Sequence, residues 1–179
     1  ASSFGFSQNS NEPAQITNTY VIKNVHIIST PDKPSVFGSI LIKDGLIHEL
    51  GKSVTIPFDA EIIEGDSMYV YAGFIDALSH AGIANIEEDK KGKSKNPGNP
   101  TNKRAGITPQ YRAFDQLSSK EKEIKNLRTA GVTIAHVVPR GKMLPGQGAI
   151  ISMHGKTNEE MTLKKDVSMF AQFKSAQGV

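Results

Sequence analysis

The stretch Tyr71–Gly82 reads YAGFIDALSHAG and separates two parts of the chain with different sequence patterns. Its apolar run, residues 72–77, is typical of a strand that is buried on both faces. Two histidines spaced by two residues would point to the same side of such a strand. Here Leu78 stands two positions before His80, so only one imidazole is present. The stretch therefore predicts a buried strand that ends beside a single histidine.

Downstream of this stretch, the pattern predicts a strand–helix–strand unit. The segment LSSKEKEIKNLRTAG predicts a helix over about 118–130, because serines suited to its start precede it and Gly131 follows its end. The next segment, VTIAHVVP, predicts a strand over 132–138 that stops at a proline. A strand, a helix and a strand in this order indicate a parallel pair.

The remaining downstream sequence is less regular. Residues 87–106 are polar and rich in Gly, Pro and Lys, which predicts a long solvated loop, with phosphate or anionic-lipid binding as the weaker alternative. Residues 149–153 predict a further strand, whereas the segment after residue 156 has no clean period.

Upstream of the stretch, the sequence predicts a small antiparallel all-β unit. Residues 19–30 are rich in β-branched and aromatic residues, and Asp44-Gly45 lies between apolar runs, a strong hairpin signal. Two more short strands are expected around Gly65-Asp66. We therefore expect a disordered or extended segment over 1–18, a β-sandwich domain over 19–71, and a second domain over 72–179.

Composition excludes several classes of protein. The 179 residues contain no cysteine, which rules out disulfides, thiolate zinc sites and cysteine nucleophiles. The net charge of +3 is too small to predict nucleic-acid binding, and no apolar run is long enough to predict a transmembrane segment. The polar start is compatible with a mature end left after signal removal or with an artificial boundary. We expect a periplasmic or secreted protein, with a cytoplasmic one as the alternative.

Several segments, in this order, resemble the N-terminal part of the amidohydrolase superfamily, nearest to its imidazolonepropionase-like and dihydroorotase-like members. The resemblance covers about residues 19–175, and its most specific part is the G-F-I-D core followed downstream by A-G-V-T and V-V-P. The segments that carry it are IKDGLIHELG (42–51), AGFIDALSH (72–80), ITPQYRAFD (107–115), RTAGVTIAHVVPRG (128–141) and LPGQGAIISMHG (144–155).

The resemblance implies a small β-sandwich followed by a TIM-like (β/α)8 barrel, with a divalent metal, usually zinc, at the barrel mouth. In the family, two histidines on the first barrel strand hold that metal, which generates hydroxide from bound water. Here Leu78 occupies the first ligand position and His80 the second. The resemblance also implies that Gly73 allows a close approach of the chain and that Asp76 is part of the scaffold.

Two departures from the family pattern limit what this chain can do. Leucine offers no lone pair, so the two-histidine site cannot form. Residues 72–179 are also too few for a barrel, which takes about 250 residues. We therefore expect the first βα units of an incomplete barrel, completed by the remainder of the barrel or by a partner chain. A larger assembly is also compatible with this expectation.

The other candidate residues have structural interpretations that we favour. For His80 itself there are two interpretations. It is a metal ligand, or it is a relic of the motif that only forms hydrogen bonds near the barrel mouth. We expect the other histidines to be packed or exposed structural residues: His26, His48, His136 and His154. Ser79 and Ser152 have no base pattern nearby, which argues against a serine nucleophile.

Three functions remain open at this point. The first is that the chain is the N-terminal part of a metal-dependent hydrolase of C–N bonds, inactive alone and with no metal expected in this chain by itself. The second is a catalytically inactive amidohydrolase-like module, a pseudoenzyme that serves as a binding or structural subunit. The third and least favoured is a surface-binding module that uses the basic loop 90–104.

Overall fold

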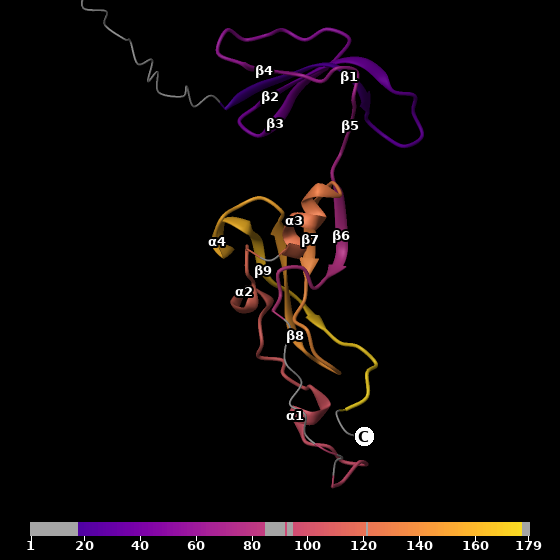
Figure 1. Ribbon diagram of the computed structural model, residues 1–179, viewed down its shortest axis with the longest axis vertical. Coiled ribbons are helices and arrows are strands. Elements are labelled where there is room, and N and C mark those ends of the chain that lie inside the picture. Colours follow the sequence, from indigo (N-terminus) through magenta and orange to yellow (C-terminus); the bar gives the residue numbers. More distant parts are fainter. Residues whose placement is uncertain (1–17, 85–91, 93–94, 121, 177–179) are drawn as a thin grey trace, which may run out of the picture. The chain divides into compact units, whose positions relative to one another are not determined.

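The computed structural model describes residues 18–84, 92, 95–120 and 122–176. The described part divides into two compact units at the Ala72–Gly73 boundary, and each is considered by itself (Figure 1). Nearly all of the N-terminal segment expected to be disordered or extended lies outside the described residues. Among the described residues, no helix combines the length and apolar character needed to cross a bilayer.

The first unit is one five-stranded sheet. Its strand order is β3-β2-β1-β4, and β5 also pairs with β1. The strands are β1 (Thr19–Ile28), β2 (Val36–Lys43), β3 (Leu46–Gly51), β4 (Glu61–Glu64) and β5 (Tyr69–Tyr71). A small core forms on this sheet from Val25, Ile27 and Ile40.

The predicted Asp44-Gly45 hairpin is confirmed. Strand β2 pairs antiparallel with β3, and Asp44 and Gly45 have φ angles of 50° and 76°. Two successive residues with positive φ form the turn whose twist matches that of the flanking strands. The local sequence therefore fixes the register of this pair.

The prediction of an all-antiparallel unit is wrong for the two strands around Gly65-Asp66. Both β4 and β5 run parallel to β1 and follow one another along the same edge. The connection between them is tied to a bulge in β1, because Gly65 N donates to the Lys23 carbonyl (2.8 Å) and Ser67 N donates to the Asn24 carbonyl (2.8 Å). The chain therefore makes a local loop and continues in its original direction, so the result is one mixed sheet.

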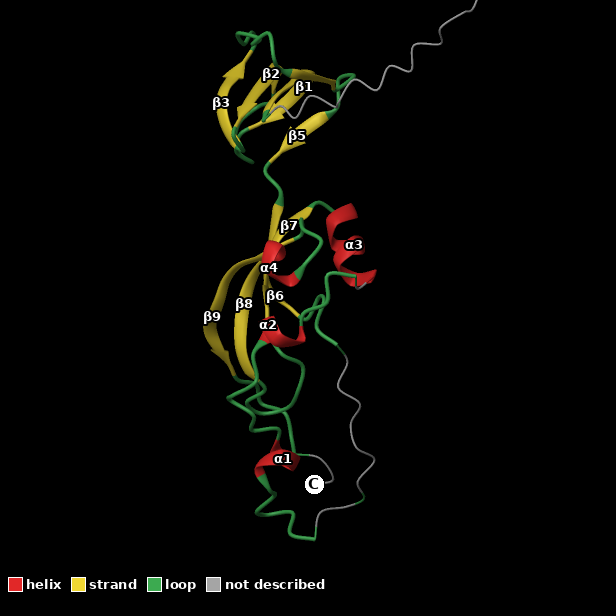
Figure 2. Ribbon diagram, turned by 90° about the vertical axis from the view of Figure 1, so that its left-hand side faces the viewer, coloured by secondary structure: helices red, strands yellow, loops and turns green. Residues whose placement is uncertain are grey.

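The second unit contains a four-stranded sheet in the order β6-β7-β8-β9, with helices on one face (Figure 2). Helix α3 lies beside β7, and two short helices contact the β8–β9 end. The strands and helices are β6 (Phe74–Ser79), α1 (Asn102–Ala105), α2 (Ala113–Gln116), α3 (Lys122–Thr129), β7 (Val132–Val137), β8 (Gly146–Ser152), α4 (Asn158–Met161) and β9 (Thr162–Phe170).

The predicted strand–helix–strand unit is present as β6, α3 and β7, with two differences from the prediction. The helix spans Lys122–Thr129 and not 118–130, and β6 is mostly exposed and not buried on both faces. Strands β6 and β7 are parallel, with Ile75 opposite Ile134 and Asp76 opposite Ala135. Helix α3 is followed by Gly131 at a φ of 87°, the left-handed conformation that glycine adopts without a Cβ clash. The order strand, helix, strand in the sequence therefore correctly predicted that β6 and β7 are parallel.

Beyond β7 the sheet does not continue as a barrel. Strand β8 is antiparallel to β7, and β9 is antiparallel to β8, so the described strands form an open mixed sheet. The sequence did not predict β9. Polar Lys164, Lys165 and Asp166 interrupt its apolar period, and the φ of 51° at Asp166 interrupts the extended backbone.

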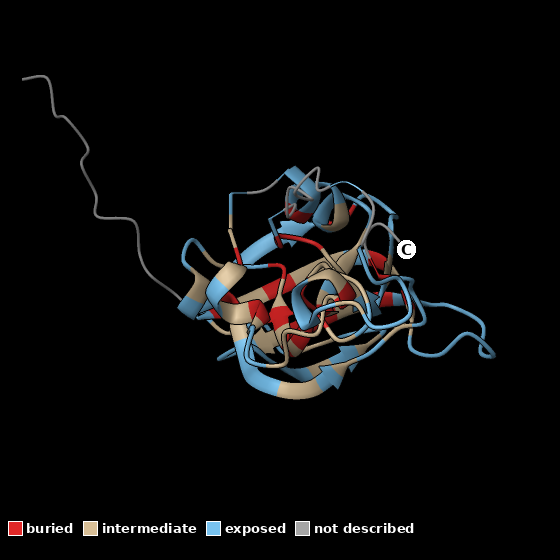
Figure 3. Ribbon diagram, turned by 90° about the horizontal axis from the view of Figure 1, so that it is seen from below, coloured by how far each residue is buried: buried red, intermediate tan, exposed pale blue. Residues whose placement is uncertain are grey.

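The core of the second unit lies between this sheet and its helices. Strands β7 and β8 direct Ala135, Val137 and Ile151 into it, and α3 contributes Ile124. All four are at most 1% exposed, and the buried residues are coloured red in Figure 3. The apolar face of a short helix is therefore used to cover the parallel pair.

Gly73 allows the chain to enter β6 closely. A Cβ at this position would overlap the side chain of Thr133 on β7. The family resemblance implied such a close approach, and the structure identifies Thr133 as the neighbour. Because the nearest atoms lie in a short branched side chain, they have little freedom to move aside.

We predict that Gly73→Ala lowers the free energy of unfolding by about 1–3 kcal/mol, because the added methyl overpacks the β6–β7 contact. Urea denaturation measures this loss. The matched control is Gly98→Ala, where the nearest atom to the added Cβ is 4.0 Å away. Equal stability of Gly73→Ala and wild type would show that β6 does not approach β7 as closely as described.

An ion pair attaches β9 to the segment before α2. Arg112 donates from Nε and Nη2 to the two carboxylate oxygens of Asp166, at 2.8 and 2.6 Å. The hydrogen bonds from Arg112 hold the pKa of Asp166 below its ordinary value of 3.8, and Asp166 raises the pKa of Arg112. The pair is about a third exposed, so solvent weakens its attraction.

We predict that Asp166→Asn reduces the dependence of stability on acid pH. The lowered folded-state pKa means that Asp166 contributes stability above 3.8, and that this contribution is lost as pH falls below 3.8 through the folded-state value. Asparagine keeps the shape and tolerates the positive φ. Urea denaturation at about pH 6 and about pH 3 should therefore show a stability difference between wild type and variant that shrinks at the lower pH. A difference that is the same at both pH values would contradict this role for Asp166.

Candidate functional site

The parallel pairing of β6 with β7 brings two polar residues to the same edge of the sheet. His80 follows the end of β6, and Arg140 lies three residues after the end of β7. Carboxyl ends of parallel strands are where sites are built in α/β proteins. Between the two residues, Val138 continues the pairing by donating its N–H to the Ser79 carbonyl at 3.0 Å.

The His80 ring is held by the main chain of the neighbouring strand. Its Nδ1 lies 2.9 Å from the Val138 carbonyl oxygen. A carbonyl oxygen can only accept, so Nδ1 carries the proton and donates. In the neutral ring Nε2 is then an acceptor, and no described residue forms a hydrogen bond with it. The ring also meets Phe170 of β9 edge-on, with centroids 6.1 Å apart.

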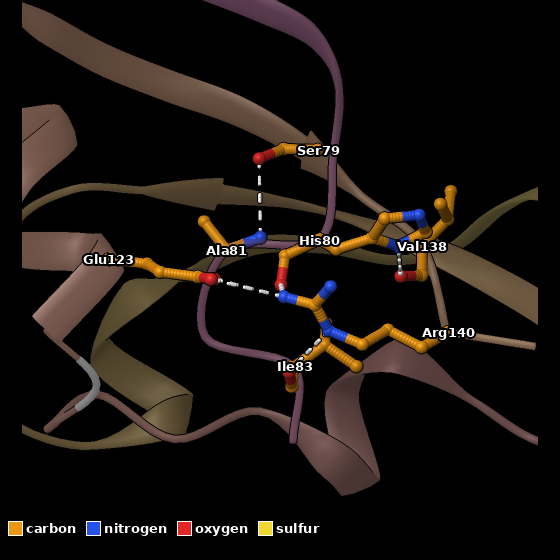
Figure 4. A network of polar contacts seen from close by, with 7 residues as sticks. All are labelled: Ser79, His80, Ala81, Ile83, Glu123, Val138 and Arg140. Atoms are coloured by element: carbon orange, nitrogen blue, oxygen red, sulfur yellow. Dashed lines mark hydrogen bonds and ion pairs between the residues drawn. The ribbon is translucent and has the colours of Figure 1, made fainter. Parts of the chain in front are cut away.

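Arg140 contacts the turn that carries His80. Its guanidinium donates from Nε to the Ile83 carbonyl (3.0 Å) and from Nη2 to the His80 carbonyl (3.3 Å). The same Nη2 also lies 3.1 Å from Oε2 of Glu123, which comes from the first turn of α3. Figure 4 shows these contacts converging on one guanidinium group.

An open pocket of about 310 Å³ lies beside this network. It is formed by the end of β6 and the turn after it, one side of α3 and Arg140. Its lining residues are Ser79, His80, Ala81, Glu123, Asn126, Leu127 and Arg140. The pocket is therefore lined by His80 and by the ion pair between Glu123 and Arg140.

Leu78 and Asp76 lie on β6 itself. The side chain of Leu78 is 55% exposed and carries no donor atom, so it cannot take part in metal binding. The Asp76 carboxylate accepts a hydrogen bond from Leu78 N at 3.2 Å, a local contact within the strand end. The assignment of His80 as a metal ligand stays a prediction.

His136 of β7 makes a different set of contacts and is not brought to His80. Its Nδ1 donates to the Ala77 carbonyl (3.1 Å), and its Nε2 accepts from the Ser168 hydroxyl (2.7 Å). Both ring nitrogens are thus used within the protein. Gly148 leaves the space for this arrangement, since a Cβ there would lie 2.6 Å from both the His136 and Ser168 atoms. His136 is a structural residue that joins β6 to β9.

The remaining histidines lie on other elements of the two units. His26 stacks on Tyr69 and meets Phe37 edge-on in the first unit, where His48 lies on the outer strand β3. His154 is exposed after β8. Within the described ranges, no group of three or more His, Asp or Glu residues gathers in a way that could hold a metal ion.

The described part of the basic loop shows no defined site. Lys90, Lys91 and Lys93 lie outside the described residues. Arg104 donates to the Gly92 carbonyl at 2.9 Å and so contributes to the local structure of the loop.

Sequence reasoning missed Arg140 and Glu123. A signal for Arg140 was present, because it directly follows the proline that stops the second predicted strand, at the edge where His80 was expected. No sequence signal pairs it with Glu123, since their contact depends on where α3 packs.

Comparison with known proteins gives a consistent relationship. No family model matches the sequence. The chain is 26% identical over 121 residues to the protein described as amidohydrolase tasK from Hapsidospora irregularis. This alignment covers 65% of this chain and 12% of that protein. It also matches the crystal structure of an amidohydrolase from Thermotoga maritima MSB8, with a TM-score of 0.65 and 25% identity over 84% of this chain and 38% of that one.

The chain thus spans only a part of each protein that it matches. Together with the order of the motifs and the parallel β6–β7 unit, these similarities identify the chain as a relative of amidohydrolases that corresponds to part of their length.

Proposed function

We propose that this chain is the N-terminal portion of an amidohydrolase-like protein, and that the longer protein is a metal-dependent hydrolase of C–N bonds in cyclic amides or peptide-like substrates. The relationship to amidohydrolases over part of their length supports the first part. On this proposal the chain does not hydrolyse a substrate alone and contributes one residue, His80, to a site that other segments complete.

The hydrogen bond between His80 and Val138 is the observation that carries this proposal. Metal-binding histidines almost always donate their second ring N–H to a carbonyl, a carboxylate or water, which fixes the tautomer. His80 has this arrangement, with Nδ1–H on the Val138 carbonyl at 2.9 Å and Nε2 left as an acceptor. Its place after β6 is also where metal ligands of barrel enzymes are found.

The metal itself would need ligands from outside this chain. A catalytic zinc ion takes three protein ligands and keeps one position for water. His80 fits one of them, whereas Leu78 does not fit another. When bound, such an ion would supply hydroxide near neutral pH. His80 would bind and orient it.

We also propose that the remainder of a barrel, or a partner chain, covers β6. Three apolar side chains of this strand are exposed: Phe74 is 54% exposed, Ile75 is 70% and Leu78 is 55%. Among the described strands β6 pairs only with β7, so its other edge can accept a further strand. Exposed apolar residues of this kind mark surfaces that bind another segment.

The alternative is a catalytically inactive module that serves as a binding or structural subunit. The specific observation in its favour is Leu78, an apolar residue at a position where the family resemblance implies a metal ligand. On this alternative His80 is a remnant whose hydrogen bond to Val138 only stabilises the turn. The location of the protein, outside the cytoplasm or within it, stays a prediction.

The metal content of the longer protein tests the hydrolase proposal. We predict stoichiometric zinc by elemental analysis, together with hydrolysis of a cyclic amide or a dipeptide. His80→Ala should weaken zinc binding by about tenfold or more, because one ligand is lost while the others remain.

Two controls separate the proposals. His136→Gln removes an imidazole of the same unit that is already fully hydrogen-bonded, and it should leave the zinc content unchanged. Leu78→His should raise zinc affinity only while His80 is present, since the two side chains are spaced for one side of the strand end. A longer protein without zinc or hydrolysis would favour the inactive module.

Amide hydrogen exchange tests whether β6 is covered. We predict that the amides of Phe74–Ser79 exchange more slowly in the longer protein than in this chain, because a second neighbour would bury the strand. The amides of Ala149 and Ile151 on β8, already in the core, serve as the reference. Equal exchange of β6 in both proteins would contradict the proposed covering segment.

A further inference from the structure

The turn after β6 is held from two sides by one short segment of chain. Val138 and Arg140 are only two residues apart, and both contact His80. Val138 accepts from the imidazole ring, whereas Arg140 donates to the carbonyl oxygen of the same residue. The ring and the main chain of His80 are therefore fixed by the same segment after β7.

Arg140 is also fixed at its other side. Its bonds to the Glu123 carboxylate, at 3.1 and 3.2 Å, connect it to α3, whose Ile124 is buried in the core. Its bond to the Ile83 carbonyl sets the far end of the turn. Three separate segments thus meet at one guanidinium group, whose planar set of N–H donors suits several acceptors at once.

This arrangement has a chemical consequence for His80. A neutral imidazole exists as two tautomers, and the hydrogen bond made by one nitrogen decides which tautomer is present. The bond from Nδ1–H to Val138 requires the ring to remain near that carbonyl, at 2.9 Å. If the turn moves, the ring loses this acceptor and the preference between tautomers is lost.

We propose that Arg140 is a positioning residue for His80. By holding the carbonyl oxygens of His80 and Ile83, it keeps the imidazole in the Nδ1–H tautomer, with the Nε2 lone pair available to a metal ion or to a substrate proton. The use of that lone pair rests on the proposed function, whereas the positioning itself does not. Glu123 supports the same role by orienting the guanidinium.

The tautomer of His80 in the 179-residue chain tests this inference. Long-range ¹H–¹⁵N NMR spectra at about pH 8, where imidazoles are neutral, distinguish the two nitrogens. The His80 signal is assigned from its loss in His80→Gln. In wild type we expect the Nδ1–H tautomer to exceed the other by about tenfold, as one hydrogen bond can provide. In Arg140→Met we expect comparable amounts of both.

Arg128→Met is the matched control. Arg128 also donates its Nε to a main-chain carbonyl, that of Met153, at 2.7 Å, and belongs to the same unit. Among the described residues Arg128 forms no hydrogen bond with His80, so its removal should leave the His80 tautomer unchanged. A simple loss of stability would affect both variants, whereas positioning affects only the Arg140 variant.

A wild-type tautomer preference in a folded Arg140→Met chain would overturn the proposal. If the amide spectrum shows that this variant is unfolded, Arg140→Lys decides the question. Lysine keeps the charge but has a single nitrogen, so it cannot reproduce the fork that reaches the His80 and Ile83 carbonyls. An unchanged tautomer in a folded Arg140→Lys chain would equally overturn it.

The two proposals fail separately. A tautomer shift in the variants of this chain, combined with absence of zinc from the longer protein, would leave Arg140 as a positioning residue and refute the metal role of His80. Zinc bound through His80 with no tautomer shift would refute only the role of Arg140.

Discussion

The parallel pairing of β6 with β7 brings together His80 and Arg140, the two residues on which the candidate site is built. Parallel strands end at the same edge of a sheet, so the residues after them become neighbours although they are some sixty positions apart in sequence. His80 and Arg140 meet for this reason. The pairing in turn depends on Gly73, which lets β6 approach Thr133, and on α3, which covers the pair with Ile124.

The second sheet departs from a barrel directly after this pair. Strand β8 reverses direction, and β9 follows it in antiparallel fashion. The sheet therefore has β6 at one edge, with apolar side chains exposed, and its best-packed strands in the middle. A strand at the edge of a sheet can pair with a further strand, and for this reason the proposed function places another segment beside β6.

Local sequence patterns were sufficient wherever a structure depends on neighbouring residues. The Asp44-Gly45 hairpin was predicted because both residues tolerate positive φ, and the strand–helix–strand unit because its apolar periods differ. The directions of β4 and β5 were not predictable in this way, since Gly65 resembles a hairpin glycine but packs against the β1 bulge. Strand β9 was missed because its polar centre is held by Arg112, a residue distant in sequence.

For the candidate site, the sequence by itself determined that one histidine would follow the first strand of the second unit and that Leu78, at the expected partner position, would offer no donor atom. The burial of that strand on both faces was predicted wrongly, because β6 lies at the edge of the sheet and is mostly exposed. It also carried the resemblance to amidohydrolases, through the order of its motifs. Only the tertiary structure decided that Nδ1 of His80 donates to Val138 and that Arg140 holds the turn between α3 and β6. These contacts join segments that are distant in sequence, so they cannot be predicted from the hydrophobic period or from the spacing of motifs. They form only after the sheet and the helix have packed.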